Sequence, residues 1–394
     1  MRLLGCAWIV LQLASAQTRA PTSAEAHLKQ AAAYQSAGDA RRAIAELRQA
    51  LELKPDLRDA HGMLGEILLA QGFAAEAVPH LERAGHVHSQ ALGLIELNRL
   101  PEALRLLLPL YRKRPGDPEI LFHLGETSGK LMQQAFDRLV RMYPDSPGAR
   151  ELRARTGPGQ TRGGLADPQE LDALLAAYVR HPGGPEALFR IGEQAEKLTQ
   201  QAFGTLIRLH PNSARAQELQ ARSYLGQGRG DLAEPLFRNA LKLSPGLAGV
   251  HLALGRILLE TSGDLEGAER EFRAEVQLRP GDAEAAWRLG SVLLKKGQAS
   301  EAMAQLQQSD RLKPNMLETL LELGKAYLMA NQVEQAEKTY RRMIEIDDTD
   351  ELTAAAHLQL SQICRKRGDS AEAERHLKRF RELTSREGRE PAAK

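Results

Sequence analysis

The chain has 394 residues with 53 basic and 51 acidic side chains, so its formal net charge is only +2. That balance argues against a nucleic-acid partner, which normally needs a basic stripe, and against a polybasic membrane-binding segment. Aromatic residues make up 4% of the chain, which is typical of helices that pack through small side chains. We therefore expect an all-α fold.

The first sixteen residues have the pattern of a secretory signal. Arg2 precedes an apolar run at residues 3–13, and Ala-Ser-Ala at 14–16 supplies a cleavage site. The run is too short to anchor the chain in a bilayer. We expect cleavage after Ala16, a periplasmic or secreted location, and no integral membrane segment in the mature chain. The alternative is a lipoprotein or membrane-associated form, because Leu-Leu-Gly-Cys at 3–6 resembles a lipobox.

A regular period follows in the second half of the chain. Pro211, Pro245, Pro280 and Pro314 lie 34, 35 and 34 residues apart. Within each period, apolar residues recur at three- and four-residue intervals in two runs, which predicts two amphipathic helices. A period of this size indicates helical hairpins that stack into a solenoid, because no single hairpin buries its own apolar face.

The order of small and large residues within the period resembles the tetratricopeptide repeat. The matching residues include Leu64, Gly65, Leu68, Gly72, Ala77, Leu81 and Ala84; Leu254, Gly255, Leu258, Ala268, Phe272 and Pro280; and Leu323, Gly324, Tyr327, Ala336 and Tyr340. The resemblance implies an α-solenoid of stacked helix-turn-helix repeats with a superhelical twist. It also implies a non-enzymatic scaffold or adaptor that binds a partner protein or peptide in a concave groove.

The middle of the chain contains a longer duplication. Residues 101–154 reappear as 168–221, and 27 of the 54 aligned positions are identical. In each copy a Gly precedes a Phe by 11 residues, whereas the ordinary repeat has 16. The turn between the two helices is therefore missing, and each copy is predicted to form one long fused helix that changes the curvature of the solenoid.

These observations divide the chain into five segments. Residues 1–16 form the signal peptide, 17–154 an N-terminal array, 155–167 a flexible linker, 168–384 a C-terminal array, and 385–394 a disordered tail. The linker is rich in glycine. It lacks the preceding strand and the Gly-Lys-Ser/Thr of a phosphate-binding loop.

No catalytic, cofactor-binding or metal-binding set is predicted. His80 and its neighbours His86 and His88 lack the helical spacing and further ligands of a metal site. Cys364, the one cysteine left after signal cleavage, falls at an apolar helix position and is expected to be a buried, inert thiol. Three further histidines share one packing position in the first helix of their repeats: His61, His251 and His357.

In tetratricopeptide proteins the first helices line the groove, and the repeat phase selects candidate binding residues. In the C-terminal array these are Arg222, Arg256, Trp287, Ser291, Lys325 and Gln362, beside Glu218, Leu252, Leu321 and Leu358. An aromatic anchor flanked by Arg and Lys suits a peptide or helix that carries acidic and apolar side chains.

Two other functions fit the same residues. The first is a structural or oligomerising subunit of an envelope assembly, secretion or polysaccharide-export complex that uses its convex face or long helices. The second is an accessory to an enzyme. The sequence indicates neither the partner's identity nor an oligomeric state.

Overall fold

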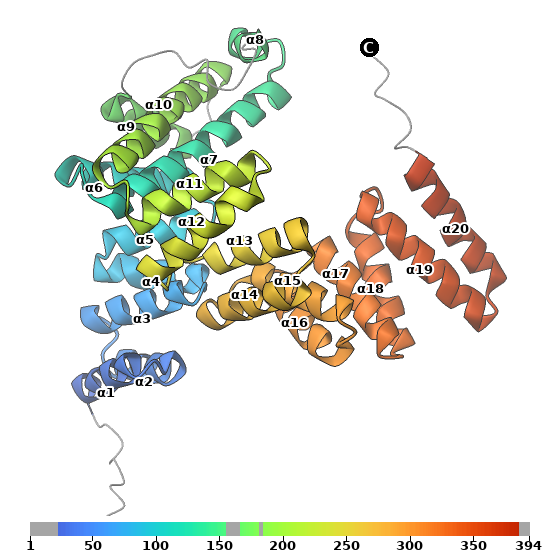
Figure 1. The fold of residues 1–394 in the computed structure, drawn as a ribbon. Coiled ribbons are helices and arrows are strands. Elements are labelled where there is room, and N and C mark those ends of the chain that lie inside the picture. Colours follow the sequence, from blue (N-terminus) through green and yellow to red (C-terminus); the bar gives the residue numbers. More distant parts are fainter. Residues whose placement is uncertain (1–22, 155–165, 181–183, 386–394) are drawn as a thin grey trace, which may run out of the picture.

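The computed structural model describes residues 23–154, 166–180 and 184–385. These ranges are helical and contain no strand, which confirms the all-α prediction. In Figure 1 the chain climbs from α1 at the lower left to α8–α10 at the top, returns through α11 and α12, and continues to α20 on the right. The predicted signal peptide lies outside the described residues. So do residues 155–165 of the predicted linker and the tail beyond Ser385.

Ordinary two-helix hairpins make up both ends of the described chain. They are α1 (Ala24–Ser36) with α2 (Ala40–Leu53), α3 (Arg58–Ala70) with α4 (Ala74–Ala84), α5 (Val87–Glu96) with α6 (Leu100–Lys113), α11 (Ala214–Gly226) with α12 (Gly230–Leu243), α13 (Val250–Ile257) with α14 (Leu265–Leu278), α15 (Ala283–Lys295) with α16 (Ala299–Leu312), α17 (Leu317–Met329) with α18 (Val333–Ile346), and α19 (Glu351–Arg367) with α20 (Ser370–Ser385). Because each hairpin packs on the next, the predicted solenoid is confirmed.

In four of the ordinary hairpins a glycine in the first helix packs against a large side chain in the second: α3–α4, α13–α14, α15–α16 and α17–α18. A Cβ on Gly65 would lie 2.7 Å from Leu81 Cγ, and one on Gly290 would lie 2.6 Å from Leu306 Cγ. Such a Cβ cannot be accommodated without a shift of the neighbouring side chain or of its helix. The small residue of the repeat is therefore fixed by close helix packing.

The hairpin of α13 and α14 carries one extra residue. Gly255 meets Phe272 in the same way, but the two are 17 residues apart rather than 16. A π-helical turn, η1 (Leu258–Ser262), directly follows α13 and takes up the additional residue. This insertion accounts for the 35-residue interval between Pro245 and Pro280.

The duplicated segments form the two predicted long helices. α7 (Pro118–Met142) and α10 (Pro185–Leu209) each run for 25 residues without a break. Between them lie α8 (Pro147–Ala154) and α9 (Pro168–Arg180). Asp167, at the end of the predicted linker, accepts hydrogen bonds from the first amides of α9.

The first half of each long helix packs against the second half of the other. Gly125 of α7 contacts the ring of Phe203 in α10, and Gly192 of α10 contacts the ring of Phe136 in α7. These are the glycine contacts of an ordinary hairpin, made here between the two copies instead of within one. Because the same 67-residue offset relates both contacts, α7 and α10 form an antiparallel pair with pseudo-two-fold symmetry. The arrangement is a domain swap within one chain.

The neighbouring helices follow the same symmetry. α8, which continues from α7, packs against α10, and α11, which continues from α10, packs against α7. Gly148 of α8 lies against Phe189, and at the equivalent place the Arg215 guanidinium of α11 stacks 4.6 Å above the Phe122 ring. The ordinary hairpins of the C-terminal array, which start at α11, therefore begin on α7. None of the described helices is both long and apolar enough to cross a bilayer.

Replacing Gly192 by Ala should lower the free energy of unfolding by about 1–3 kcal/mol, because the new Cβ would overlap the Phe136 ring. Urea unfolding followed by circular dichroism measures the change. Gly204→Ala in the same helix is the matched control, since nothing lies within 4 Å of its added Cβ. It should leave stability unchanged or slightly raised. Equal destabilisation by both substitutions would contradict the crossed packing.

Candidate functional site

The two arrays meet at a contact that we call the latch. Its N-terminal side is Gln71 and Gly72 in the α3–α4 turn together with Glu96 at the end of α5. Its C-terminal side is Arg279 and Gly281 in the α14–α15 loop. The Gly281 N–H donates to the Gln71 carbonyl at 2.8 Å, and the Arg279 guanidinium pairs with the Glu96 carboxylate at 2.8 Å. The helices from α3 round to α15 thus form a closed ring of neighbours.

The latch brings two backbones into direct contact. A Cβ on Gly281 would lie 2.8 Å from the carbonyl carbon and oxygen of Gly72. Gly72 itself has a φ of +84°, in the left-handed region that favours glycine. A larger residue at position 281 would therefore separate the two arrays.

The ring surrounds a cavity of about 980 Å³. Its walls come from the first helices of successive repeats, α3, α5, α7, α11, α13 and α15, and from the latch. This is the concave side of the superhelix. The apolar side chains that line it are Leu69, Leu92, Ile95, Phe122, Leu252 and Leu278.

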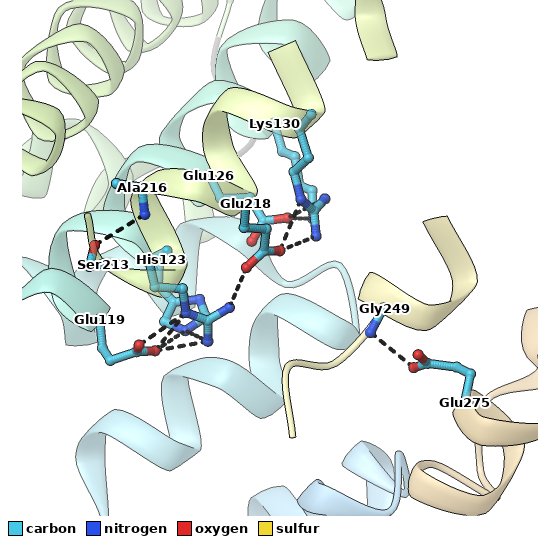
Figure 2. A network of polar contacts seen from close by, with 11 residues as sticks. Glu119, His123, Glu126, Lys130, Ser213, Ala216, Glu218, Gly249 and Glu275 are labelled. Atoms are coloured by element: carbon cyan, nitrogen blue, oxygen red, sulfur yellow. Dashed lines mark hydrogen bonds and ion pairs between the residues drawn. The ribbon is translucent and has the colours of Figure 1, made fainter. Parts of the chain in front are cut away.

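A network of ion pairs ties α11 to α7 at one wall of the cavity (Figure 2). Glu218 is fully buried and accepts from Arg215 at 2.8 Å and from Arg222 at 2.7 Å. Arg215 reaches across to Glu119 of α7 at 2.8 Å. A buried carboxylate of this kind is stable only while its cationic partners remain in place.

The network keeps its groups charged. Burial would raise the pKa of Glu119, but His123 and Arg215 approach its carboxylate and lower that pKa to about 2. At Glu126 burial again opposes ionisation, and the Lys130 ammonium, 3.0 Å away, outweighs it, so the pKa of Glu126 is lowered. Neither carboxylate changes its protonation near neutral pH. These residues hold the wall together and are not poised to donate or accept protons.

Two carboxylates near the latch have raised rather than lowered pKa values. Burial raises the pKa of Glu96, against the attraction of Arg279. Burial also raises the pKa of Glu275, which is fully enclosed and accepts from the Gly249 N–H at 2.9 Å (Figure 2). The other oxygen of Glu275 has no hydrogen-bond partner among the described residues. Sequence reasoning did not single out either carboxylate.

Some of the predicted groove residues line the cavity, and others do not. Arg222 lines the cavity, with Leu252 and the buried Glu218. Arg256 and Ser291 lie on α13 and α15 and do not line the cavity. The nearest carboxylate oxygen to the Arg256 guanidinium is that of Glu260 on the following turn, at 3.8 Å.

The remaining three predicted residues continue along the C-terminal array. Trp287 of α15 is half-buried, and the cation above its ring is the adjacent Arg288, at 4.3 Å. Lys325 of α17 pairs with Glu322 on its own helix at 2.9 Å, and Gln362 of α19 is exposed. Binding of a partner by this set stays a prediction.

Each of the three histidines at the shared repeat position forms a side-chain hydrogen bond between the two helices of its hairpin. Each lies on a first helix and its Nδ1 meets a group on the second helix: His61 with His80 at 2.7 Å, His251 with Glu271 at 2.7 Å, and His357 with His376 at 2.9 Å. Burial and the neighbouring imidazole lower the pKa of both His80 and His376. The shared position therefore has a packing role, as the repeat phase predicts.

One side-chain cluster has the composition of a metal site. Ligand atoms of Cys364, Glu372 and His376 lie within 4.8 Å of one another, from α19 and α20. The guanidinium groups of Arg341 and Arg367 pair with Glu372, and the Arg341 hydrogen bond lowers the pKa of that carboxyl to about 2. Two arginines beside the carboxylate oppose a bound cation. Cys364 is buried, as predicted, and burial raises its pKa.

Comparison with known families gives a consistent result. Family models described as tetratricopeptide repeat match residues 16–85, 224–289, 293–357 and 354–379. The protein CTR9 homolog of Arabidopsis thaliana is 25% identical over 301 residues, which cover 68% of this chain and 27% of that protein. The chain thus spans about a quarter of the length of this relative.

Solved structures resemble parts of the chain. MamA from Desulfovibrio magneticus RS-1 is 22% identical, with a TM-score of 0.42, over 45% of this chain and 97% of that one. YrrB, a TPR protein with an unusual peptide-binding site, is 18% identical, with a TM-score of 0.42, over 47% and 93%. PilF of Pseudomonas aeruginosa is 19% identical, with a TM-score of 0.41, over 55% and 92%.

Replacing Arg215 by Met should lower the free energy of unfolding by about 3–5 kcal/mol, because Glu218 would lose a partner inside the protein. Chemical unfolding measures the loss. Arg238→Met is the control, since Arg238 forms an exposed pair with Glu234 of its own helix. That change should cost about 0.5 kcal/mol or less. Similar losses in the two variants would show that the α7–α11 network does not stabilise the fold.

Proposed function

Because this chain belongs to the tetratricopeptide repeat family, we propose that it is a non-enzymatic scaffold that binds a segment of a partner protein on the concave side of its superhelix. One observation carries the proposal. Six first helices from both arrays face the same cavity, and the latch joins the arrays around it. A concave wall of this kind surrounds a bound chain segment on several sides and buries its side chains.

The chemistry of the wall supports binding. The charged groups of the α7–α11 network are held in ion pairs, and apolar residues line the same cavity. Fixed ion pairs preserve the shape of the cavity, while the apolar side chains supply contact area that a partner can cover.

The proposal includes export from the cytoplasm. Its support is the sequence pattern of residues 1–16, an Arg followed by a short apolar run and Ala-Ser-Ala. The scaffold would then act in the periplasm or outside the cell. The lipoprotein form, through Cys6, is the alternative location.

Crosslinking the protein in intact cells tests the proposal, with capture compared between variants. Leu252→Glu places a charge in the cavity and should reduce the captured partner at least about tenfold, which corresponds to a loss of about 1.4 kcal/mol. Leu243→Glu is the matched control, because Leu243 is 55% exposed on α12. The double variant Arg256→Ala, Trp287→Ala tests the predicted C-terminal groove in the same way.

The outcomes separate the candidate functions. Loss of capture in Leu252→Glu or in the double variant, with normal capture by the control, supports binding on the concave side. Full capture by every variant would instead favour a structural subunit that uses the convex face or the long helices. Sequencing of the recovered protein tests export. The proposal predicts an N-terminus at Gln17, and a chain that retains residues 1–16 contradicts cleavage.

A further inference from the structure

We infer that the cavity takes up an uncharged, apolar segment of a partner chain, and that the latch must open to admit such a segment when folded domains flank it on both sides. This inference rests on the proposed function and adds to it the class of ligand and the route of entry. Three features of the described residues lead to it: the pairing of charges around the cavity, the closed ring, and the small size of the latch contact.

All but one of the charged side chains that the structure describes around the cavity already have a partner within the protein. Glu66 bonds to His86 at 2.7 Å, and Glu284 pairs with Arg288 at 3.3 Å. Glu96, Glu126, Glu218 and Asp282 each pair with a lysine or an arginine. Among the described lining residues, Lys313 is the charged group without a recorded ion pair.

This pairing selects against a charged ligand. Apart from an acidic group beside the exposed Lys313, a charged side chain that entered the cavity would have to displace an existing partner and would leave another charge unpaired, which reduces the net gain from binding. The apolar wall imposes no such cost. Leu92, Ile95 and Leu252 line the cavity and are only partly buried, so an apolar segment can remove their remaining surface from water.

The ring determines how a segment can enter. Contacts between neighbouring helices run without interruption from α3 to α15, and the latch completes the circle. A free chain end could thread through such a ring. A segment with folded domains on both sides could not, so it needs an opening in the ring wall.

The latch is the place where the ring can open. Elsewhere the ring is held by packed helices, whereas the latch is made by a turn, a loop and two side chains. Its polar contacts are one backbone hydrogen bond and the pair between Arg279 and Glu96, whose side chains are 14% and 30% exposed. Opening therefore breaks few contacts and leaves both arrays folded.

The two glycines make the latch testable. A valine at position 281 would meet the backbone of Gly72 and hold the latch open. Gly246 also lines the cavity, but nothing lies within 4 Å of a Cβ built on it. Gly246→Val is therefore a matched control. Circular dichroism should show the same helix content in both variants and the unchanged protein.

The probe is a phage-displayed library of random dodecapeptides, selected on the full-length mature protein. The inference predicts that selected peptides are uncharged and apolar, and that Leu252→Glu weakens their binding at least tenfold. One selected sequence is then placed between two folded domains. This embedded peptide should associate at least ten times faster with Gly281→Val than with the unchanged protein, and at the unchanged rate with Gly246→Val.

Each contrary result has a separate meaning. Selected peptides that are strongly charged would overturn the ligand class. Equal association rates of the embedded peptide with all three proteins would overturn the role of the latch and leave concave binding intact. A library that yields no peptide dependent on the cavity would overturn both this inference and concave binding.

Discussion

The structure depends on one constraint: a continuous helix cannot fold back on itself. On α7, Gly125 and Phe136 are 11 residues apart, which places them about 16 Å apart along the axis. They cannot form the contact that closes an ordinary hairpin. The second copy supplies the missing partner, so Gly125 meets Phe203 and Gly192 meets Phe136. Loss of one turn in each copy thereby converts two separate hairpins into a single crossed unit.

The crossing places the C-terminal array where it can form the ring. Because the halves are exchanged, α11 starts on α7 instead of on α10, and the Arg215 network fixes it there. The next two repeats then reach the α3–α4 turn, where Gly281 meets Gln71. The cavity is therefore a consequence of the duplication. In a uniform array of ordinary hairpins, without the crossed pair, we would not expect a later repeat to contact the second one.

Much of the fold could be predicted from the sequence, because the same pattern of residues recurs at a fixed interval and that interval indicates helical hairpins. The proline spacing, the glycine paired with Leu, Phe or Tyr, and the missing turn all lie within one or two periods and report local geometry. The exchange was not predictable in this way. Phe136 and Phe203 are equivalent residues, and either fits either glycine. What excludes contact within one copy is that α7 has no turn between Gly125 and Phe136, so each glycine can meet only the phenylalanine of the other copy.

The site was harder to predict for a related reason. The position of a residue within the repeat indicates which face of a first helix points to the concave side of the superhelix. It correctly places Arg222 and Leu252 beside the cavity. It does not report where distant repeats meet. Gly72 is an ordinary turn residue and Gly281 follows an ordinary terminating proline, so nothing in either repeat marks them as a contact. For the same reason Trp287 suggested an anchor beside Arg256, whereas the cation on its ring is Arg288.

The crossed pair can be tested most directly with two cysteines, Gly129→Cys in α7 and Thr199→Cys in α10. A Cβ on Gly129 lies 3.5 Å from Thr199 Cγ2, which is within reach of a disulfide. Mild oxidation of the full-length protein should give an intrachain bond between these two cysteines, detected by mass spectrometry of the digested protein. If this bond fails to form while cysteines at Gly125 and Phe136 link within one copy, the crossed arrangement is wrong.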